Sequence, residues 1–462
     1  MKKIRAFFIF AVLVIFIAMN GGVYKNNDMV TSLSVICFSW ASLALLLMYK
    51  GLPQYNIKPK AFAISLTGIF FLFLILQAII VYNIPLGYYS DFIVIREQAI
   101  SLSEGFHIKS EYEQYFNMYP YQINIAVLIN WIYRMVGDYH RVELVSAAIV
   151  NLSAILAAIT VKNLTGNRFL AIIVAAFSEI FSLFCLKTYL PYTNNIGEIF
   201  PILCICVYTS NIKSTKKIIL MAIIAVVGTW VKITTIIPYL GICIIEGIRF
   251  IKSKEYKNIS IALATLALMF ASLSTLHHET IKRLNFNQEP SWKHGFVYFL
   301  AMGQNNQASG QFYKPIGIIG DQYYSTKTER DKIFWNIATR SIKERGVVEQ
   351  IKFFLIKISY CWGEVRQDHL NFSSYDKLIL ILRHYVWYFA LLMMTLGAFL
   401  ICDRKYYAFL MGILGVVAYL YLSEAGARYV IMYSPIVFVM MGWAIHAISR
   451  KTEVSIVKTD CQ

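Results

Sequence analysis

The carboxylate best placed for chemistry in this sequence is Asp91, which follows Ser90 at the start of a stretch with helical periodicity. A carboxylate at the start of a helix on a membrane surface can take a proton from a hydroxyl group within hydrogen-bonding distance, so Asp91 is a candidate general base. Ser90 and Asp91 are also good helix-capping residues. The two interpretations do not exclude each other, and the sequence leaves both open.

A second candidate region is the segment 423–429, in which Glu424 and Arg428 stand four residues apart. This spacing is typical of a helical ion pair, which contributes roughly 0.2–0.5 kcal/mol. Arginine is also suited to binding a phosphate through two parallel N–H bonds. We expect Arg428 to bind a phosphate group, with help from three residues that are predicted to lie on the same side of the membrane. These are Lys232, His278 and Tyr429.

Metal chemistry is not expected. His277, His278 and Glu279 are consecutive, but adjacent histidines on a helix point in different directions and do not form a convergent ligand set. The eight cysteines lack the paired spacing of a metal site or a disulfide framework. We therefore predict no metal ion and no other cofactor.

Further polar residues near the ends of apolar runs are candidates for contacts with a substrate. Tyr119 precedes Pro120 at the start of one apolar run, and Asn194 lies in a group of hydroxyls and amides beside another. Taken singly, these are ordinary features of helix starts and turns. The predicted acceptor-binding residues are Glu97, Tyr119, Asn194, Gln304, Asn305 and Glu424.

The composition indicates which elements position these residues. Of the 462 residues, 58% are hydrophobic and 15% are charged, and the mean hydropathy is +0.56. Soluble domains are about 45–50% apolar and about 25% charged, and a helix crosses a bilayer with about 20 apolar residues. The apolar residues here form long continuous blocks rather than the alternating pattern of a membrane β-barrel. The sequence predicts an all-α polytopic membrane protein and excludes a disordered chain.

Twelve stretches are predicted to span the membrane. They are 4–19, 31–49, 61–82, 142–161, 168–186, 196–212, 217–231, 234–250, 257–277, 378–402, 406–422 and 428–449. Two more apolar stretches, 121–137 and 347–362, are read as amphipathic helices in the interface. With this choice nearly all Lys and Arg clusters fall on one face, as the positive-inside rule requires, and both termini are cytoplasmic. The net charge of +17 then reflects cytoplasmic loops rather than nucleic-acid binding.

This topology divides the chain into four parts. Residues 1–60 hold two N-terminal spans, and residues 61–277 form a transmembrane core whose first outer loop is 83–141. Residues 278–377 are expected to form a loop-rich outer cap, and residues 378–462 hold the C-terminal spans and a cytoplasmic tail.

Taken together, these features resemble the GT-C superfamily of membrane glycosyltransferases, near the protein O-mannosyltransferase and aminoarabinose-transferase branch. Asp91 matches the acidic residue that opens the family's first outer loop, although Ser90 stands where a second acid is common. Asn194 and Asn195 likewise replace an acid that is common later in the family. The other matches are Tyr119-Pro120, the Lys…Trp-Gly segment at 353–363, and the late element Glu424, Arg428, Tyr429 and Pro435.

The resemblance implies transfer of a sugar from a polyprenyl-phosphate carrier to a glycan, lipid or protein acceptor on the outer face of the cell membrane. Asp91 would be the general base of an inverting reaction, and Arg428 would bind the donor phosphate. An outer-leaflet polysaccharide polymerase or ligase is an alternative that would use a diphosphate-linked oligosaccharide. A lipid-linked sugar flippase or transporter is a second alternative, which inverted repeats and broken mid-membrane helices would favour.

Overall fold

The computed structural model is helical, and the residues that it describes contain no strand. It describes residues 6, 9, 10, 13, 14, 16, 35–43, 57–83, 88, 90–183, 185, 189–287, 294–322, 326–363, 376–426 and 428–459. The predicted spans 4–19 and 31–49 lie largely outside the described residues.

Seven of the described helices are long and apolar enough to cross a membrane, and each coincides with a predicted span. They are α3 (Pro59–Asn83), α7 (Tyr139–Thr165), α11 (Ser214–Val231), α12 (Ile237–Lys252, preceded by the turn η4, Ile233–Ile236), α13 (Tyr256–Arg283), α18 (Asp376–Leu400) and α19 (Arg404–Leu422). The predicted all-helical, multi-pass architecture is therefore confirmed.

Three other predicted spans correspond to helices outside this group of seven. Residues 168–186 contain α8 (Arg168–Leu183), which is 16 residues long. Residues 196–212 do not form one helix, because a turn at Glu198 separates α9 (Thr193–Gly197) from α10 (Ile199–Thr209). Residues 428–449 cover the short helix α20 (Arg428–Ile431) and the first part of α21 (Ser434–Thr459).

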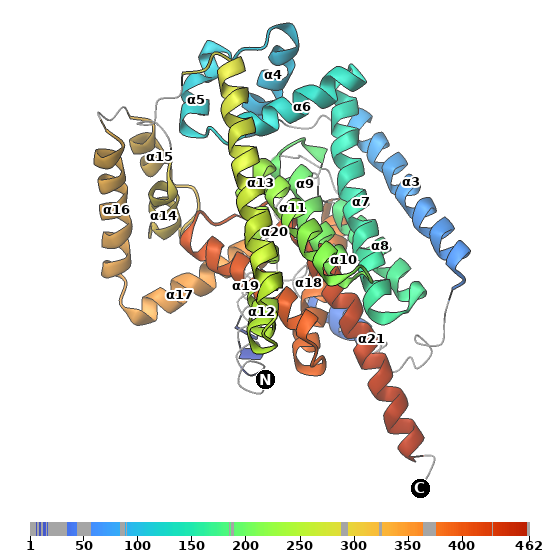
Figure 1. The fold of residues 1–462 in the computed structure, drawn as a ribbon. Helices are drawn as coiled ribbons and strands as arrows, with labels where there is room; N and C mark the ends of the chain where they lie inside the picture. Colours follow the sequence, from blue (N-terminus) through green and yellow to red (C-terminus); the bar gives the residue numbers. More distant parts are fainter. Residues whose placement is uncertain are drawn as a thin grey trace.

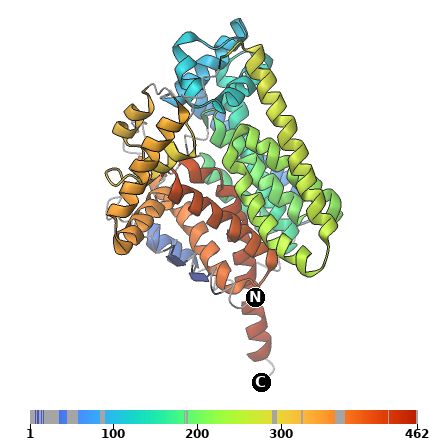
Figure 2. The same cartoon turned by 60° about the vertical axis from the view of Figure 1, so that its left-hand side comes forward.

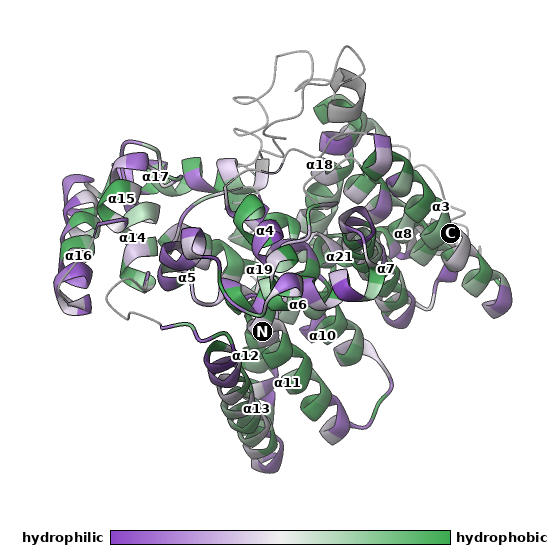
Figure 3. Ribbon diagram, turned by 90° about the horizontal axis from the view of Figure 1, so that it is seen from above, coloured by the Kyte–Doolittle hydropathy of each residue, from purple (hydrophilic) through white to green (hydrophobic). Residues whose placement is uncertain are grey.

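The helix surfaces distinguish the membrane-facing elements from the core. No residue of α13 is buried, and its apolar Leu263 and Leu268 are 62% and 68% exposed. Exposed apolar surface of this extent suits contact with lipid rather than water. Figure 3 shows the same contrast, because α11, α12 and α13 are largely apolar whereas α5 and α16 carry many polar residues.

Two close helix packings form the centre of the bundle (Figure 1). Helix α21 packs against α7, α8 and α18, and α12 packs along α19 in the opposite direction. At the crossing of α12 and α19, a Cβ atom on Gly241 would collide with the backbone of Gly412. The two backbones can approach this closely because both positions are glycine.

Residues 83–141, predicted as the first outer loop, contain a helical layer at one end of the bundle, at the top of Figure 1. It contains α4 (Asp91–Glu104), the turn η2 (Ser110–Tyr112), α5 (Glu113–Met118) and α6 (Gln122–Val136). Phe92, Ile95, Ala99 and Leu102 of α4 are all buried, as the helical periodicity predicts, but the polar Gln98 and Ser101 are buried as well. With 15 residues, α6 is shorter than the roughly 20 residues that span a bilayer.

The cap is more helical than the loop-rich segment that the sequence predicts. It contains α14 (Phe296–Gln304), α15 (Lys314–Gly320), α16 (Lys327–Glu344), α17 (Val347–Ile358) and a π-helical turn, η5 (Ser359–Gly363), which together form one side of the molecule in Figure 2. Helix α16 begins with a capping bond, in which the Thr326 hydroxyl accepts from the backbone N–H of Glu329. The cap is joined to the first layer where the backbone N–H of His294 donates to the Met118 carbonyl at 2.9 Å.

Candidate active site

Asp91 is the first residue of α4, and its carboxylate is directed toward two distant parts of the chain. The Tyr192 hydroxyl donates to Asp91 Oδ2 at 3.1 Å, and Arg428 Nη2 lies 3.9 Å from the same oxygen. Ser90 occupies the capping position with φ = +48°, but its side chain makes no capping bond. The capping interpretation therefore does not account for this carboxylate, which faces Tyr192 and Arg428.

Arg428 begins α20 and opposes Asp91 from the C-terminal part of the chain. Its Nη2 donates to the Tyr429 hydroxyl at 3.0 Å, and its guanidinium carbon lies 5.0 Å from the centre of the Tyr429 ring. The side chains of Asp91 and Arg428 are each 25% exposed. At 3.9 Å the two charged groups are at the limit of direct contact, so each of them can still bind another partner.

Lys232 provides a second positive charge at the same place. It lies between α11 and η4, its ammonium group donates to Asn194 Oδ1 on α9, and it lies 4.8 Å from the centre of the Tyr429 ring. Burial, together with repulsion from Arg428, lowers the pKa of Lys232 to about 7. The two cations therefore lie beside one aromatic ring, where the positive charge of Arg428 disfavours the charged form of Lys232.

Glu424 lies between α19 and α20 and supplies a second carboxyl group. Burial raises the pKa of Glu424, while the positive charge of Arg428 acts in the opposite direction. Of the predicted phosphate-binding and acceptor-binding residues, Arg428, Lys232, Tyr429, Asn194 and Glu424 thus meet near Asp91. The Asp91–Arg428 cluster consists of Asp91, Tyr192, Asn194, Lys232, Glu424, Arg428 and Tyr429.

Tyr192 is the member of this cluster that the sequence prediction missed. It is buried, its ring packs 4.6 Å from that of Phe92, and its hydroxyl accepts a bond of 2.7 Å from the Gln122 amide. Burial and the nearby charge of Asp91 hold the pKa of Tyr192 well above its ordinary value, so the phenol stays protonated and donates to Asp91. The polar run near Asn194 is the only sequence signal that points to this tyrosine.

Tyr119 lies beside the cluster rather than within it. Its ring contacts those of Tyr115 at 5.1 Å and His294 at 4.8 Å, so it lies where the first layer meets the cap. The negative charge of Asp91 is one of the influences that raise the pKa of Tyr119, although burial is the largest. Tyr119 is therefore close enough to Asp91 for electrostatic interaction.

Four predicted residues are engaged or oriented elsewhere. Glu97 accepts a hydrogen bond from the Tyr112 hydroxyl, and His278 is on the exposed surface of α13. Gln304 donates to the Tyr421 carbonyl at 2.7 Å and accepts from Arg345 at 2.6 Å. Asn305 stabilises its own turn, since its amide oxygen accepts from the backbone N–H of Ala308 at 2.7 Å. None of the described contacts of these four side chains joins them to Asp91 or Arg428.

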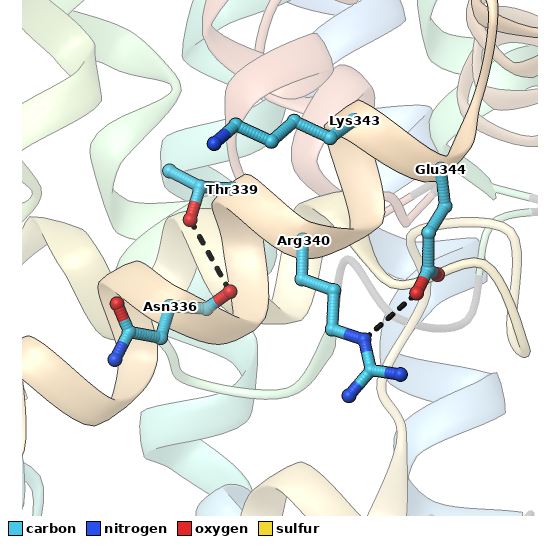
Figure 4. A pocket seen from close by; sticks show the side chains of 5 residues that line it. All are labelled: Asn336, Thr339, Arg340, Lys343 and Glu344. Atoms are coloured by element: carbon cyan, nitrogen blue, oxygen red, sulfur yellow. Dashed lines mark hydrogen bonds and ion pairs between the residues drawn. The ribbon is translucent and has the colours of Figure 1, made fainter.

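Two further features of the described residues lack the geometry of a functional site. No group of three or more His, Cys, Asp or Glu side chains among them is arranged to hold a metal ion, and His277 is paired with Asn124 at 2.7 Å. An open depression on α16 is shown in Figure 4 and is lined by Asn336, Thr339, Arg340, Lys343 and Glu344. It involves one helix face and an exposed ion pair between Arg340 and Glu344, so it lacks the buried convergent groups of a site.

Comparison with known proteins gives one result. No curated protein and no solved structure matches the chain. A family model described as "conserved hypothetical integral membrane protein" matches residues 4–361, about three-quarters of the sequence. Together with the seven apolar helices long enough to cross a membrane, this match shows that the chain belongs to that family of integral membrane proteins.

Proposed function

We propose that this protein transfers a sugar from a polyprenyl-phosphate-linked donor to a glycan, lipid or protein acceptor. One observation carries the proposal: a carboxylate and a guanidinium from distant parts of the chain face each other at 3.9 Å, and each remains 25% exposed. A general base and a phosphate-binding group must be close together and open to substrates in such a transferase.

The chemistry requires two charged functions and no cofactor. A hydroxyl oxygen of the acceptor attacks the anomeric carbon, its proton passes to Asp91, and the bond between that carbon and the phosphate oxygen breaks. The bonding electrons leave with the phosphate, and polyprenyl phosphate is released. Attack from the face opposite the leaving group inverts the anomeric centre, by analogy with inverting glycosidases.

Arg428 and Lys232 would stabilise the departing phosphate. The donor phosphate would take over the edge of the guanidinium that faces Asp91 in the substrate-free protein, and this would free the carboxylate to act as a base. Lys232 lies beside the same Tyr429 ring and adds a second positive charge. Charge placed in advance where a leaving group becomes negative is among the largest contributions to catalysis.

The proposed orientation places this cluster on the outer face of the cell membrane. It assumes twelve spans with both termini in the cytoplasm, so that α19 runs outward and ends just before Glu424. The basic clusters after α12 and before α19 would then face the anionic inner leaflet, as the positive-inside rule favours. A lipid-linked donor in the outer leaflet would present its phosphate at the level of Arg428.

Release of polyprenyl phosphate from a panel of polyprenyl-phosphate sugars tests the proposal. Purified protein in nanodiscs should release the carrier from at least one monosaccharide monophosphate donor. Asp91→Asn should reduce release to background while donor binding stays at the wild-type level, because the amide cannot accept the proton. Glu111→Gln is the matched control, since Glu111 is a 60% exposed carboxylate in the same outer layer and should not affect transfer.

Three outcomes would contradict the proposal. Full activity of Asp91→Asn would eliminate this residue as the base. Release only from diphosphate-linked oligosaccharides would indicate a polymerase or ligase. Translocation of the carrier across liposomes without any sugar transfer would indicate a flippase.

A further inference from the structure

Lys357, on α17, is a fully buried lysine whose ammonium group makes three hydrogen bonds to backbone carbonyls. It donates to the carbonyls of Gly303 at 2.7 Å, Tyr421 at 2.9 Å and Ser423 at 2.7 Å. An ammonium group has three N–H donors, so this side chain has none left for a ligand. Its role must therefore come from the segments that it connects.

Those segments are the end of α14, the end of α19 and the turn after α14. The backbone N–H of Ala425 donates to the Gly310 carbonyl at 2.7 Å. A Cβ atom on Gly303 would collide with the Ser423 carbonyl, and Gly310 has φ = +78°, a conformation that favours glycine. We call this contact region the Lys357 junction, and it consists of Gly303, Gly310, Lys357, Tyr421, Ser423 and Ala425.

The junction lies at the C-terminal end of α19, where a helix leaves carbonyl groups without intrahelical partners. A positive charge is favourable at this end of a helix because it interacts with the helix dipole. Lys357 bonds the carbonyls of Tyr421 and Ser423, which flank the end of α19 at Leu422. It therefore fixes the direction in which the chain leaves the helix.

Glu424 follows Ser423 directly, and Arg428 lies four residues after Glu424. We propose that Lys357 is a positioning residue that holds the segment 423–428 so that Arg428 faces Asp91; this inference rests on the proposed function for the role of Arg428. The cap thereby acts on catalysis from a helix that contributes no group to the reaction. Lys357 would affect the reaction only through the placement of Arg428.

Hydrogen–deuterium exchange tests the junction without any assay of activity. In Lys357→Met, amides of 421–431 should exchange roughly tenfold faster or more, because the variant loses three charge-assisted hydrogen bonds and the loss of even one shifts a local opening equilibrium by that order. Amides of α7 should be unaffected. Lys352→Met is the matched control, since Lys352 lies on the same helix, is 60% exposed and pairs with Glu349. Unchanged exchange in 421–431 would overturn the proposal.

A second variant covers the case in which Lys357→Met fails to fold. Gly310→Ala would bring a Cβ atom within 2.7 Å of Lys357 Cε and disturb the junction from the opposite side. It should accelerate exchange in the same segment. If it folds and exchange there does not change, the proposal is likewise overturned.

A double-mutant cycle tests the link to Arg428. Lys357→Met should lower kcat/KM by about tenfold in the wild-type background but by less than about twofold in an Arg428→Gln background, because residues that act as one unit are non-additive. An equal loss in both backgrounds would show that Lys357 does not act through Arg428. If no donor is turned over by the wild type, the proposed function fails, whereas the exchange measurement still decides whether Lys357 holds the segment.

Discussion

The helix pair α12 and α19 carries a charged cluster at each end, and the two clusters differ in how completely their charges are paired. At the end away from Asp91, Glu246 on α12 forms ion pairs with Arg249 at 2.9 Å and with Arg404, at the start of α19, at 2.8 Å. The Tyr208 hydroxyl also donates to this carboxylate. The Glu246 side chain is only 10% exposed, so nearly all of its interactions are with protein.

The Asp91–Arg428 cluster at the other end is paired less completely. The distance between its carboxylate and guanidinium is 3.9 Å, about 1 Å longer than in the Glu246 cluster, and the Asp91 side chain is 25% exposed, against 10% for Glu246. Its second carboxyl group, Glu424, has a raised pKa, and its second cation, Lys232, has a lowered one. These shifts indicate that burial disfavours both charges more than their neighbours stabilise them.

The two clusters differ in how completely their charged groups are already paired within the protein. This difference distinguishes a structural role from the proposed binding role. Short contacts that use both oxygens of the Glu246 carboxylate join α10, α12 and α19, so this carboxylate is already engaged within the protein. Longer, partly exposed contacts between charges of both signs retain the capacity for a ligand, as binding a phosphate and a hydroxyl requires. Perturbed pKa values also cluster at functional sites. The proposed function therefore uses only the less completely paired end of this helix pair.

The largest effect is expected from Arg428→Gln. We expect kcat/KM for the donor to fall by about 10²–10³-fold, or about 3–4 kcal/mol, because a preorganised donor to the developing charge is lost. The melting temperature should hardly change, since a partly exposed ion pair contributes about 0–1 kcal/mol. Transfer assays and thermal melts on the same preparation measure both quantities.

Arg340→Gln is the control for that variant, because it removes an 82% exposed arginine of the cap. It should leave transfer and melting unchanged. A large fall in melting temperature for Arg428→Gln, with little change in kcat/KM, would mean that the Asp91–Arg428 cluster is structural, like the Glu246 cluster.

Glu246→Gln should show the opposite profile. Removing the charge leaves Arg249 and Arg404 without their shared carboxylate. We expect the free energy of unfolding to fall by about 1–2 kcal/mol, less than for a fully buried pair, because the two arginines are 35% and 43% exposed and solvent screens part of the interaction. The kcat/KM of the folded fraction should stay at the wild-type value. Denaturant titration in micelles measures the first quantity, and Glu349→Gln, which breaks an exposed pair with Lys352, is the control. Loss of transfer without loss of stability would contradict the assignment of this cluster.

The sequence was sufficient to predict much of this arrangement because hydropathy and charge bias report on depth in the membrane. Asp91, Lys232 and Arg428 are far apart in the chain but share the same predicted face. Lys232 directly follows the predicted span 217–231, Arg428 begins the span 428–449, and Asp91 follows the span 61–82 by nine residues. Residues that share a membrane face are already confined to one layer. Their meeting then depends on helix packing alone, and the structure brings these three together.

The remaining features depend on tertiary contacts that hydropathy does not encode. The break at Glu198 lies inside an apolar run, and only Gly197 and Pro201 nearby mark an interrupted helix. Lys357 stands in an apolar stretch as an ordinary interfacial lysine, and its three carbonyl partners come from distant segments. The prediction likewise chose Gln304 and Asn305 for their polarity, although their hydrogen bonds are used within the protein.

The smallest effect expected is a pH dependence that originates at Lys232. Its pKa of about 7 means that the side chain is cationic below pH 7 and neutral above it, whereas the phosphodiester of the donor is anionic throughout. Donor affinity should therefore be complete near pH 6 and decrease as the pH rises through 7. Bound phosphate raises the pKa of Lys232, so the loss levels off at about tenfold in KM, or about 1.4 kcal/mol.

Steady-state KM for the donor between pH 6 and 9 measures this effect, and Lys232→Arg provides the decisive comparison. Arginine stays charged over the whole range, so the KM of this variant should be independent of pH. The wild-type KM should rise while that of the variant stays constant. An equal rise in both proteins would assign the pH dependence to another group, and would leave Arg428 as the phosphate-binding cation for which the geometry still argues. A KM that is independent of pH in both proteins would mean that Asn194 and the Tyr429 ring keep Lys232 charged over this range. Lys232 would then be paired within the protein, as Glu246 is.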